Sequence, residues 1–257
     1  MILAIDVGNS DIVIGGYEND RLCFTSRCSS DRRKTIDEYA LIFKGILELH
    51  NVTPDRIQSG IISAVVPSLR NLIQRAFEAL TGSAFLTVTS GIKTGLNIRT
   101  DYPGELGSDL VAGAVAAIAK YPKPIIIFDM GTATTVSVVD QHGAYLGGML
   151  YPGLRISVEA LSSCADQLPS IMLNAPERLI GRNTEECMQS GAIHGCAAML
   201  DGLIDRLDAE LAIPSTAVIT GGLASLVVPF CHKAIVVNQN LLLDGLYILY
   251  KKNRARR

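Results

Sequence analysis

Two stretches of this sequence place an aspartate at the end of an apolar run and follow it directly with glycine and small polar residues. The first is Ile2–Val13, in which Asp6 precedes Gly8. The second is Ile125–Thr135, in which Asp129 takes the same place. Each pattern predicts a buried strand, a tight turn and a returning strand, because glycine permits close backbone approach and short polar residues favour turns. The N–H and hydroxyl groups of such a turn can hold a phosphate.

The leading aspartate of each turn points to a metal ion beside the phosphate. A carboxylate repels phosphate, so we expect Asp6 to hold Mg²⁺, directly or through water, and the ion to bridge the phosphate oxygens. Two facing turns, one from each half of the chain, would then clamp a nucleoside triphosphate. Taken singly, each stretch also fits an ordinary hairpin turn, but the repetition within one chain favours a binding site.

The composition is that of a compact globular protein. The chain has 257 residues, of which 48% are hydrophobic and 19% are charged, and its net charge is −2. This charge argues against a nucleic-acid binder held by bulk electrostatics. The basic run Lys251–Arg257 is interpreted as a solvated, frayed helix end.

Several features favour a cytoplasmic protein. The six cysteines form no CxxC pair and no zinc-site spacing, so they are interpreted as small buried hydrophobes in a reducing compartment. Asp6 interrupts the first apolar stretch without a basic leader before it, so we expect no signal peptide. The longest apolar run, Leu110–Ala119, is far shorter than the roughly 20 residues that span a bilayer. We therefore expect neither a membrane nor a nucleic acid among its partners.

The elements around the first turn are expected to follow the order βββαβαβ. Thr35 and Glu38 have the spacing of a capping box, which predicts a helix of about four turns that ends near His50. Pro67 suits the first turn of a second helix, which ends at Gly82. The expected strands, besides the one that ends at the first turn, are Ile12–Tyr17, Leu22–Ser26, Ile61–Val65 and Phe85–Val88.

The second half repeats this scheme after a long loop, Ser90–Gly107. Ser108 is expected to be the N-cap of an apolar helix. Gly147, Gly148, Pro152 and Gly153 are expected to break the third strand of this half into a loop before the next helix. The predicted elements are strands over 125–129, 134–139, 144–150, 217–220 and 236–237, and helices over 156–165, from Asn183, and over 241–250.

Two further groups of glycines are candidates for contacts. Gly191, Gly195 and Gly202 thin one side of the helix that starts at Asn183, which permits close packing against a neighbouring helix or a second subunit. The turn Gly221–Gly222 leaves room for the flat face of a base or a ribose.

A doubled βββαβα unit with a phosphate-binding hairpin in each half resembles the duplicated ribonuclease H-like fold of the acetate and sugar kinase, actin and heat-shock chaperone ATPase superfamily. Within it, the sequence is similar to the type III pantothenate kinases. The resemblance covers essentially the whole chain. It is carried by Asp6–Ser10, Ser63–Pro67, Gly107–Asp109, Asp129–Thr135, Gly147–Gly148 with Pro152–Gly153, Gly181–Thr184 running to Met188–Gly191, and Thr220–Gly222. It implies two actin-like halves, 1–106 and 107–257, with a nucleotide cleft between them.

The resemblance also implies an activity: ATP-dependent phosphorylation of pantothenate to 4′-phosphopantothenate, the first step of coenzyme A biosynthesis. It implies a homodimer that uses Mg²⁺ with ATP and a monovalent cation, K⁺ or NH₄⁺, beside Asp129. Asp109 would be the general base on the pantothenate hydroxyl. The residues implied for ATP phosphates are Asp6, Val7, Gly8, Asn9, Ser10, Asp11, Gly131 and Thr132, with Asp6 also on Mg²⁺. Those implied for the substrate are Tyr102, Gly107, Ser108, Asp109, Leu110 and Thr184.

Some of these residues also have structural interpretations. Asp109 fits a structural acid in the first turn of its helix, where the helix dipole favours negative charge. This interpretation is compatible with catalysis, because an ionised Asp109 can accept a hydrogen bond from an alcohol. Tyr102 fits either a substrate contact or a loop anchor. Asn183 is expected to be an N-cap, which leaves the Thr184 hydroxyl available. His142 and His194 have no partner that suggests catalysis.

The sequence departs from the family at two positions that bear on the substrate. Leu110 stands where the family has an arginine, and leucine cannot replace its hydrogen bonds. Thr100 stands where a tyrosine is expected, while Arg99 and Arg155 are candidates to replace the missing cation.

Two alternative functions stay open. One is a kinase of the same fold for another small hydroxylated acid, because the departures from the family would reshape the acceptor pocket. The other is a nucleotide-binding regulatory paralogue with weak or no catalysis. The presence of Asp6, Asp109, Asp129 and Thr132 argues against the second.

Overall fold

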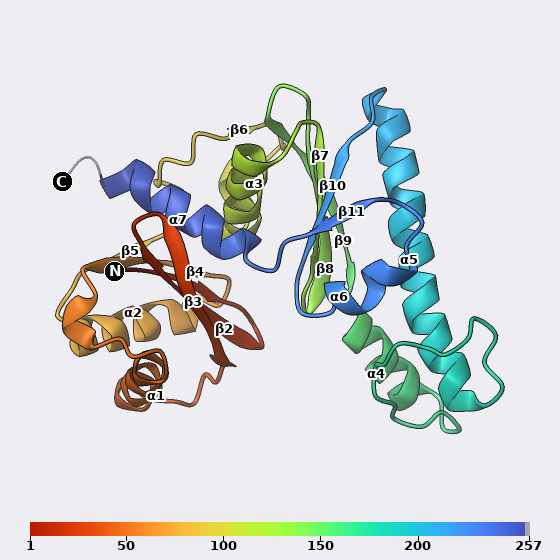
Figure 1. Cartoon of the computed structure of the whole chain (residues 1–257), viewed down its shortest axis with the longest axis horizontal. Coiled ribbons are helices and arrows are strands. Elements are labelled where there is room, and N and C mark those ends of the chain that lie inside the picture. Colours follow the sequence, from red (N-terminus) through yellow and green to blue (C-terminus); the bar gives the residue numbers. More distant parts are fainter. Residues whose placement is uncertain (255–257) are drawn as a thin grey trace. The chain divides into compact units, whose positions relative to one another are not determined.

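The computed structural model describes residues 1–254, which form two compact units (Figure 1). Unit 1 contains residues 1–96, 102–116 and the described residues from 240 on, and unit 2 contains residues 97–101 and 117–239. The first turns of the helix at Ser108 and the final helix as far as residue 254 belong to unit 1, because they pack with the N-terminal sheet. The end of the predicted basic run, 255–257, lies outside the described residues.

The sheet of unit 1 has five strands in the order β3-β2-β1-β4-β5. β1 (Ile2–Val7), β2 (Asp11–Glu18) and β3 (Arg21–Ser29) form the predicted antiparallel meander. β4 (Ser59–Ala64) lies parallel to β1, and β5 (Phe85–Thr87) lies parallel to β4. Each parallel pair is joined through a helix, as a parallel crossover requires.

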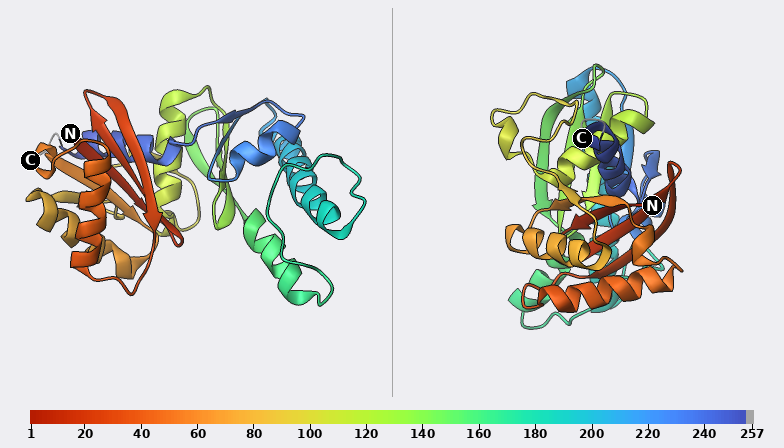
Figure 2. Two further views of the ribbon diagram at one scale, coloured as in Figure 1. Left: turned by 60° about the horizontal axis from the view of Figure 1, so that its bottom comes forward. Right: turned by 90° about the vertical axis from the view of Figure 1, so that its left-hand side faces the viewer.

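Two helices cover one face of this sheet. α1 (Ile36–Leu49) and α2 (Pro67–Thr81) lie side by side there (Figures 1 and 2). The predicted ends are confirmed: Thr35 and Glu38 form a capping box at the start of α1, and Gly82 ends α2 in the left-handed conformation, with φ of 66°. A short 3₁₀ turn, η1 (Pro54–Arg56), precedes β4.

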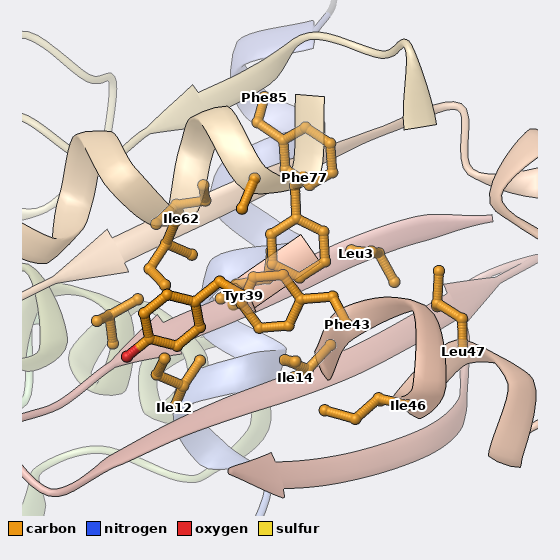
Figure 3. Close-up of a cluster of buried hydrophobic side chains, with 14 of the residues drawn as sticks. Leu3, Ile12, Ile14, Tyr39, Phe43, Ile46, Leu47, Ile62, Phe77 and Phe85 are labelled. Atoms are coloured by element: carbon orange, nitrogen blue, oxygen red, sulfur yellow. The ribbon is translucent and has the colours of Figure 1, made fainter. Parts of the chain in front are cut away.

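Stacked aromatic rings lie among aliphatic side chains in the core between these helices and the sheet (Figure 3). The rings of Phe43 and Phe77 stack with centroids 4.0 Å apart, and Phe77 also stacks on Phe85 of β5. Leu3 and Ile5 of β1 point into this core. Burial of such side chains stabilises the fold by about 1.5–3 kcal/mol each.

The opposite face of the same sheet packs against α3 (Ser108–Lys120) and α7 (Leu241–Arg254). Ile2 and Ala4 of β1 belong to this second core. Gly245 of α7 is needed there, because a Cβ at this position would lie 1.9 Å from the carbonyl oxygen of Ala112 in α3. The alternation of β1 side chains between two buried cores explains why the strand is apolar from Ile2 to Ile5, before Asp6.

The sheet of unit 2 repeats this topology. Its strands lie in the order β11-β10-β7-β8-β9-β6. Taken in the reverse direction, β9-β8-β7-β10-β11 corresponds strand for strand to β3-β2-β1-β4-β5 of unit 1. The parallel and antiparallel pairings also correspond, so the predicted duplication is confirmed. The bounds are β7 (Ile125–Met130), β8 (Ala133–Val139), β9 (Ala144–Pro152), β10 (Thr216–Thr220) and β11 (Ile235–Val237).

The helices of unit 2 also follow the repeated scheme. α4 (Leu154–Cys164) and α5 (Thr184–Leu211) connect β9 to β10, and α6 (Ala224–Val227) with η3 (Val228–Phe230) connects β10 to β11. Asn183 is the N-cap of α5, as predicted, since its side chain accepts a hydrogen bond from the Glu186 N–H at 2.9 Å. The buried side of α5 packs into a core with Phe128 and Ile219 of the sheet.

The predicted break of β9 is confirmed at Pro152 and Gly153, where the strand ends and α4 begins, but it was wrong at Gly147 and Gly148. The strand continues to Pro152, with a bulge opposite Val138 and Val139. Gly148 is required by close packing of the two strands, since a Cβ there would lie 1.8 Å from the Val136 carbonyl oxygen. Gly147 has φ of 141°, which glycine accepts without strain. These glycines therefore shape the strand instead of ending it.

Two details of the long loop also differ from expectation. β6 (Asn97–Ile98) pairs in parallel with β9, a contact too short to show a periodic pattern. A 3₁₀ turn, η2 (Pro103–Glu105), follows it. Ser108 is the first residue of α3 and not its N-cap, because the Val111 N–H bonds to the Gly107 carbonyl at 3.0 Å.

The expectations for the cysteines and the basic end were partly wrong. All six cysteines are free thiols, but Cys23, Cys164 and Cys187 are exposed and only Cys196 is fully buried. At the end of α7, Lys251 pairs with Asp20 at 2.8 Å, so the described part of the basic run is held to the fold. No helix among the described residues has the length and apolar character needed to cross a membrane.

Candidate active site

The first predicted turn joins β1 to β2. A hydrogen bond of 2.9 Å from the Gly8 N–H to the Asp11 carbonyl closes it. Asn9 and Ser10 at its tip are exposed. Val7 is fully buried in the core, so only its backbone is available to a ligand. The turn therefore offers main-chain groups and small polar side chains, as a phosphate site requires.

Asp6 lies one residue before the end of β1. It pairs in register with Val13 of β2 on one side and with Ser63 of β4 on the other. Its side chain is half-buried, whereas Ser63 has no exposed surface. The backbone at Asp6 is therefore held between two neighbouring strands.

The start of α3 lies against the same edge of the unit 1 sheet. The hydroxyl of Ser108 is hydrogen-bonded to the hydroxyl of Ser63 at 2.9 Å. Asp109 follows, half-buried, in the first turn of the helix. A Cβ on Gly107 would lie 2.5 Å from the Asp109 Oδ1, so glycine gives this carboxylate the space it occupies. The structure thus connects Asp6 to Ser108 and Asp109 through Ser63.

The second predicted turn joins β7 to β8 in unit 2. Asp129 takes the register position of Asp6: it pairs with Thr135 of β8 and with Thr220 of β10. The Gly131 N–H donates to the Ala133 carbonyl at 3.1 Å, and Thr132 is exposed. Both turns therefore present an aspartate at the same point of the same topology.

Two glycines support the second turn from within unit 2. A Cβ on Gly153 would lie 2.3 Å from the Thr132 carbonyl oxygen, and one on Gly221 would lie 2.4 Å from the Met130 carbonyl oxygen. Gly221, with φ of 98°, thus makes room for the β7 backbone. On the side where a Gly221 side chain would project, the space is filled by the Met130 backbone.

The remaining candidate residues lie on separate elements. Tyr102, in the long loop, is 71% exposed. Thr184 is the exposed first residue of α5, and the cap at Asn183 leaves its hydroxyl out of the helix start. Arg99 and Arg155 are both exposed.

Comparison with known proteins decides the family. The type III pantothenate kinase family model matches residues 2–206. A type III pantothenate kinase from Brevibacillus brevis is 43% identical over 255 residues, which covers 99% of this chain and 100% of the relative. The chain belongs to the type III pantothenate kinases. A second relative, from Geobacter sulfurreducens, is 41% identical over 254 residues, with 99% of this chain and 100% of the relative covered.

Solved structures extend the likeness at the level of the fold alone. The (R)-2-hydroxyglutaryl-CoA dehydratase component A from Acidaminococcus fermentans is 14% identical, with a TM-score of 0.58, covering 100% of this chain and 99% of that one. The ethanolamine utilization protein EutJ from Carboxydothermus hydrogenoformans is 13% identical, with a TM-score of 0.56, covering 96% and 89%. This type III pantothenate kinase therefore has the duplicated actin-like ATPase fold that the sequence predicted.

The donor set of this type III pantothenate kinase suits a metal that arrives with its nucleotide. Among residues 1–254, no three His, Cys, Asp or Glu side chains are grouped so that they could hold an ion by themselves. Mg²⁺ in phosphoryl-transfer sites keeps several waters and takes one or two carboxylates together with phosphate oxygens. One carboxylate at Asp6 fits that requirement.

At Leu110 and Thr100, the two positions predicted to depart from the family, the side chains are partly buried. Leu110 follows Asp109 in α3 and lies near Gly107, 3.8 Å from where a Cβ would stand. The hydroxyl oxygen of Thr100 is buried and has no hydrogen-bond partner among the described residues.

Sequence reasoning did not identify Ser30, whose hydroxyl donates a hydrogen bond to the Gly8 carbonyl of the first turn. A single serine after a strand carries no distinctive signal in the sequence.

Proposed function

We propose that this chain transfers the γ-phosphoryl group of ATP to the terminal hydroxyl of pantothenate, giving ADP and 4′-phosphopantothenate in the first step of coenzyme A biosynthesis. The observation that carries the proposal is the family match over most of the chain, together with an intact Asp6 turn and a half-buried Asp109 at the start of α3. Because the reaction consumes ATP, we place the enzyme in the cytoplasm.

Phosphoryl transfer requires the protein mainly to align the attacking and leaving oxygens and to neutralise charge on the moving group. In our proposal the turn of Gly8, Asn9 and Ser10 binds ATP phosphates through main-chain and hydroxyl groups. Gly131 and Thr132 serve the same purpose from unit 2. Mg²⁺ with ATP is held by Asp6 and supplies the positive charge that the phosphate oxygens need.

Asp109 is the proposed general base. It lies half-buried in the first turn of α3. An ionised carboxylate can accept the proton of the pantothenate hydroxyl as its oxygen attacks the γ-phosphorus. Gly107, Ser108, Leu110, Tyr102 and Thr184 are the proposed substrate contacts. Asp129 is proposed to lie beside a monovalent cation, K⁺ or NH₄⁺.

We also propose that the enzyme is a homodimer that forms through one face of unit 2. A Cβ at Gly191 or at Gly195 on α5 would meet nothing within 4 Å. An open groove of about 480 Å³ lies there, lined by Leu179, Ile180, Gly181, Cys187, Ser190, Gly191, His194 and Gly195. Ile180 is 80% exposed and Leu179 is 66% exposed. Apolar surface of this kind commonly marks a protein interface.

The mass in solution tests the dimer. Light scattering after gel filtration should give twice the chain mass for the wild type. Gly195→Arg should give the mass of one chain, because its side chain would project into the interface. Gly45→Arg, at a glycine of α1 that also faces open space, serves as the control and should stay dimeric. A monomeric wild type would contradict this part of the proposal.

The alternative of a kinase for another small hydroxylated acid keeps one specific observation in its favour. Leu110 and Thr100 replace a cation and a phenol that the family uses at the substrate, so the acceptor pocket has lost polar groups. A different acid with fewer carboxylate contacts would suit such a pocket.

A coupled assay of ADP release in the presence of Mg²⁺ and K⁺ tests the function. Pantothenate should stimulate ADP release, and replacement of K⁺ by Na⁺ should lower the rate. ATP binding without stimulation by pantothenate would overturn the substrate assignment and favour the other hydroxylated acids. Absence of turnover with every acid tested would favour the regulatory paralogue.

A further inference from the structure

Ser30 is the first residue after β3, and it contacts the turn between β1 and β2 at two points. Its hydroxyl donates a hydrogen bond of 2.8 Å to the carbonyl of Gly8. Its backbone N–H donates a hydrogen bond, also of 2.8 Å, to the carbonyl of Ser10. The two carbonyls on either side of Asn9 are thus bound to one residue.

These two bonds fix the direction of two peptide groups. In a planar trans peptide the N–H points away from the preceding carbonyl oxygen. With the Gly8 and Ser10 carbonyls directed at Ser30, the N–H groups of Asn9 and Asp11 point away from Ser30. A turn of two exposed residues would otherwise sample several orientations.

Ser30 is itself held in place by the core. The next residue, Asp31, donates its N–H to the hydroxyl of Tyr39 at 2.8 Å, and that hydroxyl donates to the Asp31 carbonyl at 2.9 Å. Tyr39 has no exposed surface and stacks on Phe43. A chain of contacts therefore leads from the core of unit 1 through Ser30 to the turn.

A neighbouring ion pair also favours phosphate binding at this turn. Arg27 on β3 pairs with Asp11 at 3.3 Å, which draws the Asp11 carboxylate towards β3. Both side chains are about half-exposed, so the pair contributes little by itself. Its effect is to lower negative charge at the turn, which an incoming phosphate requires.

We propose that Ser30 is a positioning residue for the nucleotide phosphates: it holds the Gly8–Ser10 turn so that amide N–H groups are already directed at the ligand. This rests on the proposed binding of ATP at that turn. Donors that are oriented before binding cost no reorganisation when the phosphates arrive. Ser30 does not itself touch the nucleotide in this proposal.

The test uses the full-length protein with Ser30→Ala, Ser30→Thr and the control Ser29→Ala. Ser30→Ala removes the hydroxyl bond and should raise the KM and the Kd for ATP about five- to tenfold, the effect of one hydrogen bond. The KM for pantothenate should stay at the wild-type value. Ser30→Thr keeps a hydroxyl and should restore most of the affinity for ATP. Ser29 is exposed, so Ser29→Ala should behave as the wild type.

Each other outcome has a defined meaning. An unchanged KM for ATP in Ser30→Ala, or an equal change in Ser29→Ala, would overturn the role of Ser30. An equal loss for both substrates together with a lower Tm would also overturn it, since that is the result of a purely structural contact. If Ser30→Ala does not fold, Ser30→Cys, with its weaker S–H donor, must show the selective loss for ATP. A wild type that binds no ATP would instead refute the proposed function.

Discussion

Ser63 of β4 and Ser108 of α3 are joined by a hydrogen bond of 2.9 Å between their hydroxyls. Ser63 is fully buried and pairs in register with Asp6, while Ser108 precedes Asp109. One buried hydroxyl therefore links the proposed metal carboxylate to the helix that carries the proposed base. The bond fixes where α3 begins relative to the sheet of unit 1.

Ser63→Ala should lower kcat, because the first turn of α3 loses its tie to the sheet. We expect a loss of about 1 kcal/mol in the free energy of unfolding and a three- to tenfold fall in kcat, which steady-state kinetics and urea denaturation would measure. Ser59→Ala is the matched control: Ser59 lies on the same strand and donates to the Ala84 carbonyl at 2.7 Å. It should lose similar stability and keep its kcat. Equal kinetic losses in both variants would disprove a specific role for Ser63.

Asp109→Asn should abolish most turnover without affecting the fold. An amide of the same shape cannot take the proton of an alcohol, and loss of a general base costs about 10²–10⁴-fold in rate. Single-turnover kinetics would measure the rate, and isothermal calorimetry would check that ATP still binds. Asp101→Asn, in the exposed loop before α3, is the control and should keep full activity. Wild-type turnover in Asp109→Asn would remove this carboxylate from the mechanism.

Much of this fold could be predicted because its signals are local. The capping box at Thr35, the left-handed cap at Gly82 and the N-cap at Asn183 were all found where the sequence indicated. The pattern of a strand, an aspartate and a glycine turn occurs twice in the sequence, and this repetition predicted the duplicated fold. Each of these depends on residues within a few positions of one another.

The errors concern contacts between distant segments. Gly148 reads as a strand breaker, yet the Val136 backbone lies where its side chain would be. Ser108 reads as an N-cap, but its hydroxyl bonds to Ser63, far away in the sequence. Ser30 could not be found at all, because its partners lie on the preceding hairpin. Such roles are decided by packing, which sequence periodicity does not report.

Leu110→Arg tests whether the acceptor pocket is otherwise that of the family. A guanidinium at this position can bind a carboxylate through two hydrogen bonds, so the KM for pantothenate should fall about tenfold. Leu110→Met, which changes shape but not charge, is the control and should leave this KM unchanged. Steady-state kinetics with pantothenate as the varied substrate would measure both. An unchanged or higher KM in Leu110→Arg would indicate a remodelled pocket and support a different acid.

The capping box of α1 should make the stability of unit 1 depend on pH. The backbone N–H of Thr35 donates to the Glu38 carboxylate at 2.7 Å, and this bond lowers the pKa of that carboxyl below its ordinary value. A lowered pKa in the folded state means that the stabilisation is fully present above the ordinary pKa and is lost as the pH falls through the lowered one.

Urea denaturation at about pH 6 and at about pH 3 should therefore show the wild type losing its advantage in stability over Glu38→Gln at the lower pH. Asp37→Asn removes a charge from the same first turn and so separates the helix-dipole contribution from that of the capping box. A constant difference between the wild type and Glu38→Gln at both pH values would show that the ionised carboxylate adds nothing to the cap.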